Sequence, residues 1–138
     1  MLDHVIYRIT HIERFCNTSG MNGKETLMND RTIMMRIDLV ALETRKEEDR
    51  QDQKWGQQDH PDGTGPTDGN LSDRNRAKWV TQREFAKRRG TWRQVLEEEV
   101  AEAFAESDPD LLKAELIQVA AVAQQWIRAI NRRQEEQQ

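Results

Sequence analysis

Residues 91–118 read TWRQVLEEEVAEAFAESDPDLLKAELIQ, and this stretch decides the fold. Thr91 with Gln94 three residues later forms a capping box, which predicts the start of a helix that ends near Glu106. Asp108 followed by Pro109 is an acidic cap before a proline at the first helical position, so a second helix begins there. Because the intervening turn is short, the two helices are expected to form an antiparallel αα-hairpin.

Two glutamates interrupt the apolar stripes of this hairpin. At about 100° per residue, Glu99 falls among Trp92, Val95, Leu96 and Ala103. By the same spacing, Glu115 shares a face with Leu112, Val119, Val122 and Trp126. An isolated buried charge is costly, so each carboxylate is expected to be paired, protonated or bound to a metal. Glu102 and Gln118 follow one turn later at the stripe edges, and the hairpin therefore predicts three converging carboxylates and an amide.

Two structural interpretations compete with a metal site. A solvated run of charge suits Glu97, suits Glu98 less clearly, and suits Glu99 and Glu115 poorly. Alternatively, each buried glutamate pairs with a base of the preceding helix, such as Lys78 or Arg83. The functional interpretation is a divalent-cation site, because hard cations such as Mg²⁺ take oxygen ligands and bridge carboxylates to substrate phosphates.

The glutamate spacing resembles a known family motif. Glu99-Val-Ala-Glu102, twelve intervening residues and Glu115-Leu-Ile-Gln118 resemble the motif of MazG-like all-α nucleoside triphosphate pyrophosphohydrolases, in which Glu-x-x-Glu is followed by Glu-x-x-Asp. Glu98 matches the usual Glu-Glu doublet, and the likeness covers about residues 91–133. Residues 48–56 and 60–65 also look like MazG-like proteins of phages and actinobacteria.

This resemblance implies a reaction and a set of residues. It implies Mg²⁺, or Mn²⁺ in its place, held by Glu99, Glu102, Glu115 and Gln118, with Glu98 or Glu102 as the catalytic base. Hydrolysis of a nucleoside triphosphate at the α-phosphorus would release a monophosphate and pyrophosphate. The expected substrate-binding residues are Trp55, His60, Asp62, Lys78 and Arg83.

The chain departs from the family at Gln118, where the motif has aspartate. A neutral ligand removes one compensating charge, so metal affinity should fall. Either Gln118 still coordinates, or another acid replaces it, or catalysis has been lost. Two alternative functions therefore stay open: a nucleotide-binding protein without turnover, and a helical interaction module whose glutamates are structural.

The remainder of the chain predicts two further helices and a long loop. One helix is expected to begin after Asn29-Asp30, and a basic one to run from Ser72 to Arg89 and stop at Gly90. Residues 56–66, GQQDHPDGTGP, are too rich in turn formers for a tight connection. This loop is either functional or a solvated linker. Trp55, which precedes the loop, either stacks on a nucleobase or packs against the end of the helical bundle. The other large aromatic residues are expected in the core: Trp79, Trp92, Trp126, Phe85 and Phe104.

The length and composition of the chain indicate its broad structural class. The 138 residues carry a net charge of −4, with 33% charged and 36% hydrophobic residues, so one domain with a small private core is expected. Residues 1–28 are assigned as a peripheral extension, 29–133 as the helical domain and 134–138 as a polar tail. The segment 111–130 is apolar around much of its circumference, which predicts a four-helix-type core completed in a homodimer or homotetramer.

The net charge and the absence of targeting signals limit the expected binding partners and cellular location. The acidic balance argues against nucleic acid. The single cysteine, Cys16, provides no disulfide framework. Since neither a signal peptide nor an apolar run long enough to span a bilayer is present, a cytoplasmic location without membrane contact is expected.

Overall fold

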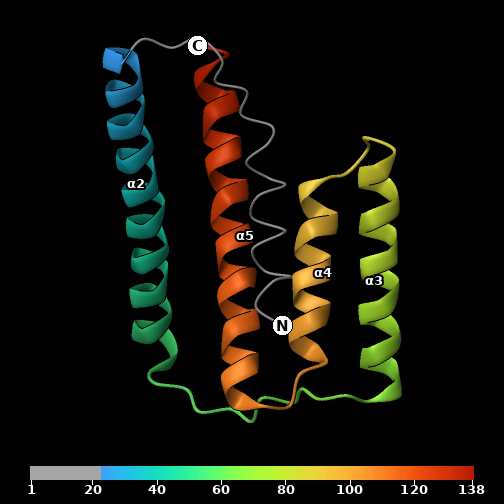
Figure 1. Cartoon of the computed structure of the whole chain (residues 1–138). Helices are drawn as coiled ribbons and strands as arrows, with labels where there is room; N and C mark the ends of the chain where they lie inside the picture. The colour runs from blue at the N-terminus through green and yellow to red at the C-terminus, as the bar shows by residue number, and fades with distance from the viewer. Residues whose placement is uncertain (1–22) are drawn as a thin grey trace. The chain divides into compact units, whose positions relative to one another are not determined.

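The protein is all-helical over the residues that its computed structural model describes, the backbone of 23–138 and the side chains of 39–138. The helices are α2 (Gly23–Trp55), α3 (Asp68–Ala86), α4 (Trp92–Phe104) and α5 (Pro109–Glu135), with no strand in this range (Figure 1). The all-α prediction is therefore confirmed. None of these helices is both long and apolar enough to cross a membrane.

The chain divides into two units, residues 1–36 and 37–138, and each is described by itself. Helix α2 begins at Gly23, earlier than the start predicted after Asp30. It therefore runs through the predicted boundary between the extension and the helical domain. Most of the predicted extension, residues 1–22, lies outside the described part of the chain.

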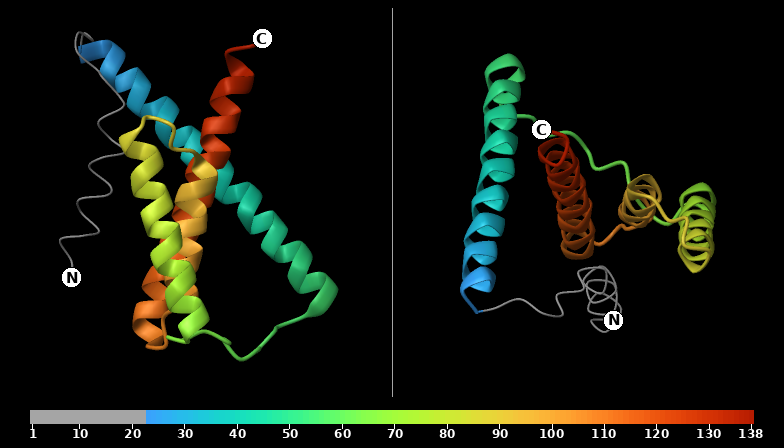
Figure 2. Two further views of the ribbon diagram at one scale, coloured as in Figure 1. Left: turned by 90° about the vertical axis from the view of Figure 1, so that its right-hand side faces the viewer. Right: turned by 90° about the horizontal axis from the view of Figure 1, so that it is seen from above.

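Three antiparallel helices build the part of the fold that carries the glutamates. Helix α4 packs against α3 on one side and against α5 on the other, and seen end-on it lies between them (Figure 2). The predicted αα-hairpin is α4–α5. Within the part of the chain that the structure describes, α3 and α5 each contact α4 and do not contact each other, so these three helices form a layer with two broad faces.

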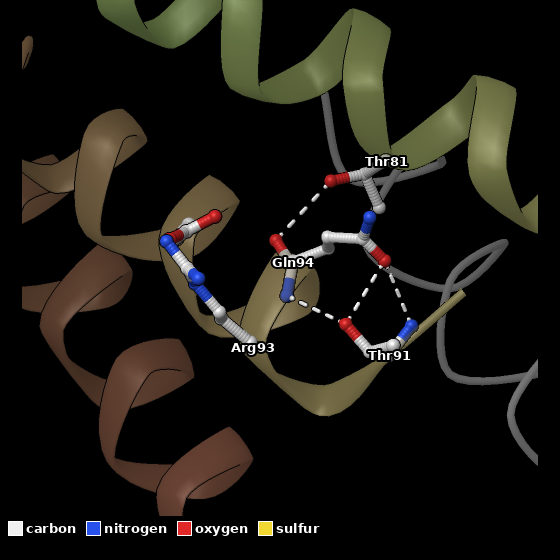
Figure 3. Close-up of polar contacts among 5 residues, drawn as sticks. Thr81, Thr91, Arg93 and Gln94 are labelled. Atoms are coloured by element: carbon white, nitrogen blue, oxygen red, sulfur yellow. Dashed lines mark hydrogen bonds and ion pairs between the residues drawn. The ribbon is translucent and has the colours of Figure 1, made fainter. Parts of the chain in front are cut away.

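Local capping fixes the hairpin as the sequence predicts. The Thr91 amide donates to Gln94 Oε1 (2.9 Å) and the Gln94 amide donates to Thr91 Oγ1 (3.5 Å), which completes the capping box (Figure 3). Thr81 Oγ1 donates to the Gln94 carbonyl (3.1 Å) and ties α3 to the start of α4. At the start of α5, Asp108 Oδ1 accepts from the amides of Asp110 (3.0 Å) and Leu111 (3.1 Å). Each cap satisfies amides that have no partner within their own helix.

The start of α3 differs from the prediction of Ser72. The helix begins at Asp68, and Thr67 caps it by accepting from the Asn70 amide (3.2 Å). Asn70 Nδ2 also donates to the carbonyls of Gly65 and Phe104, each at 2.9 Å. Since these contacts hold the first turn of α3 against the end of α4, tertiary structure extends the helix beyond its local capping signal.

The end of α3 also comes earlier than predicted, at Ala86. Arg88 adopts a left-handed conformation (φ 57°), and the amides of Arg88 and Arg89 donate back to the carbonyls of Phe85 (3.0 Å) and Glu84 (2.8 Å). A Cβ at Gly90 would collide with the Phe85 ring. The glycine is therefore needed for the close approach of this ring.

Replacing Gly90 with alanine is expected to destabilise the fold by about 1–3 kcal/mol, because the Phe85 ring must move to admit the methyl group. Gly69 is the matched control, since a Cβ there meets only Thr67 Oγ1 at 4.0 Å and alanine favours a helix. Urea unfolding of both variants measures the difference. Equal stability of Gly90→Ala and wild type would contradict the steric role.

The core of the described residues is small, and part of the predicted core is exposed. The buried apolar side chains are Val40, Ala103, Ala105, Leu112, Val122 and Ala129. Trp92 and Trp126 are half-buried. Trp79, Phe85 and Phe104 are 58%, 46% and 54% exposed, so their assignment to the core is wrong. Their helix faces have apolar character but no packing partner among the described helices.

Candidate metal centre

Three carboxylates converge between α4 and α5. One oxygen each from Glu99, Glu102 and Glu115 lies within 4.8 Å of the other two. Glu99 is only 5% exposed, whereas Glu102 and Glu115 are half-buried. The antiparallel hairpin produces this arrangement, because Glu99 and Glu102 precede the turn by about as many residues as Glu115 follows it.

Close carboxylates favour a cation. Like charges at this separation disfavour joint ionisation unless positive charge lies nearby. Oxygen ligands in such a cluster suit Mg²⁺, Mn²⁺ or Ca²⁺ rather than soft metals. The donor set therefore fits a hard divalent cation.

Gln118 lies beside this carboxylate group. Its Nε2 donates to Glu115 Oε2 at 2.7 Å, and the side chain is half-buried. The amide therefore orients Glu115. The sequence prediction that Glu99, Glu102, Glu115 and Gln118 lie together agrees with this geometry.

The neighbouring glutamates of α4 differ in their surroundings. Glu98 is 3% exposed, although it is not one of the three carboxylates grouped within 4.8 Å. Glu97 is exposed and its Oε1 pairs with Arg93 Nε at 2.7 Å. Glu97 is thus the solvated residue that the sequence predicts, while Glu98 is more buried than its position in a charge run indicates.

The loop candidates lie outside this cluster. Trp55 ends α2, is 53% exposed, and has Lys54 Nζ 4.5 Å from its ring centroid. His60 Nε2 lies 2.8 Å from Gln58 Oε1, and both His60 and Asp62 are exposed. The Gly65 amide, near the end of the loop of residues 56–66, donates to the Phe104 carbonyl of α4 (3.0 Å). That amide is therefore engaged and does not serve as a phosphate ligand.

The basic candidates belong to α3, which packs on α4 rather than on α5. Lys78 is half-buried there. Arg83 stacks on Trp79, 4.4 Å from the ring centroid, and its Nε pairs with Glu84 Oε1 at 2.9 Å. Arg83 thus has a structural partner that the sequence analysis did not identify.

Glu84 is a buried charged residue that the sequence analysis did not identify. It is buried and also accepts from Arg89 Nη2 at 2.9 Å. The available signal was its place in the inner stripe of α3, with Ala77, Val80 and Thr81 at helical spacing. Burial by itself would raise the pKa of Glu84, but the Arg83 hydrogen bond and the Arg89 charge outweigh burial and hold this pKa below its ordinary value of 4.5.

A pH dependence of stability follows from this lowered pKa. The ion pairs of Glu84 are expected to stabilise the fold fully above about pH 4.5 and to be lost as pH falls through the lower pKa of the folded state. Glu84→Gln should therefore be less stable than wild type near neutrality, with a difference that shrinks in acid. Urea unfolding across pH measures this, and a difference that stays constant with pH would contradict it.

Comparisons with protein-family models, with curated proteins and with solved structures gave no match.

Proposed function

We propose that the protein is a divalent-cation-dependent hydrolase that cleaves a nucleoside triphosphate to a monophosphate and pyrophosphate, in the manner of MazG-like enzymes. The convergence of Glu99, Glu102 and Glu115 within 4.8 Å carries this proposal. Their spacing resembles the family motif, and their location on facing helices is typical of carboxylate-metal centres in bundles.

Each residue of the carboxylate cluster is assigned its own role in this proposal. Glu99 and Glu115 would hold the cation from facing helices, and Gln118 keeps Glu115 oriented through the 2.7 Å hydrogen bond. Glu102, which like Glu115 is half-buried, would accept a proton from an attacking water. When bound, Mg²⁺ supplies positive charge for the triphosphate and lowers the pKa of water.

A second candidate function rests on Gln118. The amide replaces an anionic ligand of the family motif, so the cluster has three carboxylates for a divalent cation and an anionic substrate. This weaker charge compensation favours a protein that binds a nucleotide with its cation and does not turn it over. The two candidates differ only in whether cleavage follows binding.

One experiment separates them. Purified protein is incubated with Mg²⁺ and a panel of ribo- and deoxynucleoside triphosphates, and the products are resolved by chromatography. Monophosphate with pyrophosphate supports the hydrolase. Metal-dependent protection from thermal unfolding by one nucleotide, without products, supports the binder. Neither turnover nor protection would contradict both and favour a helical interaction module.

A further inference from the structure

The last turn of α3 and the residues that follow it concentrate positive charge. Residues 83–89, REFAKRR, contain four basic residues and one acid, in a chain whose net charge is −4. The exposed cations beyond the helix end are Lys87, Arg88 and Arg89. Arg83 Nε and Arg89 Nη2 share the carboxylate of Glu84, each at 2.9 Å. One carboxylate does not neutralise two guanidinium groups, so this segment, the basic turn, is positive although the whole chain is acidic.

The backbone of the basic turn ends α3 with a residue that is unusual at its position. The Arg89 amide donates to the Glu84 carbonyl (2.8 Å) and the Arg88 amide to the Phe85 carbonyl (3.0 Å), which is the pattern of a Schellman motif. The left-handed position of this motif commonly holds glycine, because a Cβ disfavours a positive φ. Here Arg88 occupies it, with φ 57°. The chain therefore places a cation where backbone conformation alone favours glycine.

An exposed tryptophan of α3 adjoins the basic turn. Trp79 is 58% exposed. It lies about 160° around the helix from Thr81, whose hydroxyl donates to α4, so Trp79 faces away from α4. Arg83 covers only one face of the ring, 4.4 Å from its centroid. Because Arg83 also pairs with Glu84, which binds Arg89, an unbroken series of contacts joins the ring to the turn.

We propose that the basic turn and the outer face of α3 bind single-stranded nucleic acid. The cations contact phosphates, and a base stacks on the Trp79 ring. Aromatic rings beside cations hold single strands in this way without reading their sequence. The rise of the helix separates Trp79 from Lys87 by about 12 Å, so the two contacts call for a strand rather than a mononucleotide. A duplex would offer its phosphates to the turn, but its paired and stacked bases are not free to reach the tryptophan.

The side chains around Trp79 favour a nucleic acid over a membrane surface. Asn75 and Gln82 lie within about 60° of Trp79 around α3, and both are exposed. Amide groups donate to and accept from base edges, whereas a helix that lies on a lipid surface presents an apolar face. Cations near the end of a helix also stabilise its dipole, which accounts for the basic residues but not for an exposed ring among amides.

Fluorescence anisotropy of labelled oligothymidylate tests this surface. EDTA in the buffer keeps the assay independent of the carboxylate cluster and of the proposed hydrolase activity. Wild-type protein should bind with a Kd on the order of 1–100 µM at physiological salt. The excess of three positive charges in the basic turn should give a slope of about −2 for log affinity against log salt.

Trp79→Ala should weaken oligothymidylate binding on the order of tenfold, because a stacking platform is lost, and should leave the salt slope unchanged. Trp55→Ala is the matched control. The Trp55 ring is also exposed, at 53%, and also has a cation over it, Lys54, but the preceding residues 47–52 include four acids. This control should bind as wild type does.

Arg88→Gly separates a loss of binding from a loss of folding. Glycine is favoured at a left-handed position, so this variant should unfold at the same or a higher temperature than wild type. Its affinity for oligothymidylate should nevertheless fall, and the magnitude of the salt slope should fall by about 0.7. Lys113→Ala removes a cation from an exposed position of α5 and should leave both the affinity and the slope unchanged.

Four results would overturn the proposal. The first is no binding of oligothymidylate even at low salt. The second is Trp79→Ala that is folded by circular dichroism and binds as tightly as Trp55→Ala. The third is Arg88→Gly that binds as tightly as Lys113→Ala, a comparison that still holds if Trp79→Ala unfolds. The fourth is binding to phosphatidylglycerol vesicles without binding to the oligonucleotide, which would assign the surface to a membrane.

Discussion

Glu99→Gln is expected to abolish cation binding at the carboxylate cluster and, with it, nucleotide turnover. Glu99 is the most buried of the three converging carboxylates, at 5% exposure, so its charge is the least screened by water. Substituting residues that merely support a metal ligand costs about 10–100-fold in metal affinity or activity. Loss of a ligand itself should therefore cost on the order of 100-fold or more.

The control for this substitution is Glu97→Gln. The same chemical change is made two residues away on the same helix, but Glu97 is exposed and paired with Arg93. Titration with Mn²⁺ followed by paramagnetic resonance measures binding directly, and product chromatography measures turnover. If Glu99→Gln binds Mn²⁺ as tightly as Glu97→Gln does, the cluster is not a metal centre and its glutamates are structural.

Stability of Glu99→Gln distinguishes the functional and structural interpretations further. Removing one negative charge from three carboxylates whose oxygens lie within 4.8 Å of one another relieves repulsion among them, so the neutral variant should unfold at the same or a higher temperature than wild type in EDTA. Mg²⁺ should raise the unfolding temperature of wild type alone. A large loss of stability in EDTA would instead indicate that Glu99 forms a structural ion pair.

The hairpin was predictable from the sequence because its signals are local. Thr91 with Gln94 and Asp108 with Pro109 each act within a few residues, so the chain adopts these caps wherever the helices pack. The convergence of Glu99 and Glu115 follows from the same local periodicity together with a short turn. The carboxylate group is therefore the part of the candidate site that sequence reasoning reaches most directly.

The features that the sequence did not predict depend on contacts between segments that are distant along the chain. Ser72 has the chemistry of a cap, but Asn70 is held by the carbonyls of Gly65 and Phe104, and α3 starts earlier as a result. The exposure of Trp79 and Phe104 was not predictable, because an apolar stripe does not reveal whether a partner helix exists to cover it. Glu84 was missed for the related reason that Arg89 reaches it only after the helix has ended.

Gln118→Asp is expected to have opposite effects with and without a cation. In wild type, Gln118 Nε2 donates to Glu115 Oε2 at 2.7 Å. Aspartate removes this donor and adds a negative charge beside a half-buried carboxylate, so the variant should lose about 1–3 kcal/mol of stability in EDTA. With Mg²⁺, the added charge becomes a ligand, and affinity should rise on the order of tenfold, or about 1.4 kcal/mol.

The stability difference between Gln118→Asp and wild type should change sign when Mg²⁺ is added. If the Gln118 amide had only a structural role, the variant would be less stable than wild type under both conditions. Thermal unfolding in EDTA and in increasing Mg²⁺ should give curves for Gln118→Asp and wild type that cross. Gln125→Asp is the control: it makes the same change on α5 at a half-buried position two turns further on, and Mg²⁺ should raise its unfolding temperature by the same amount as that of wild type. If nucleotide turnover also appears or increases only in Gln118→Asp, the natural chain is a binder whose catalysis is limited by this one missing charge. Turnover in wild type with no gain in the variant would instead mean that the Gln118 carbonyl is a sufficient ligand.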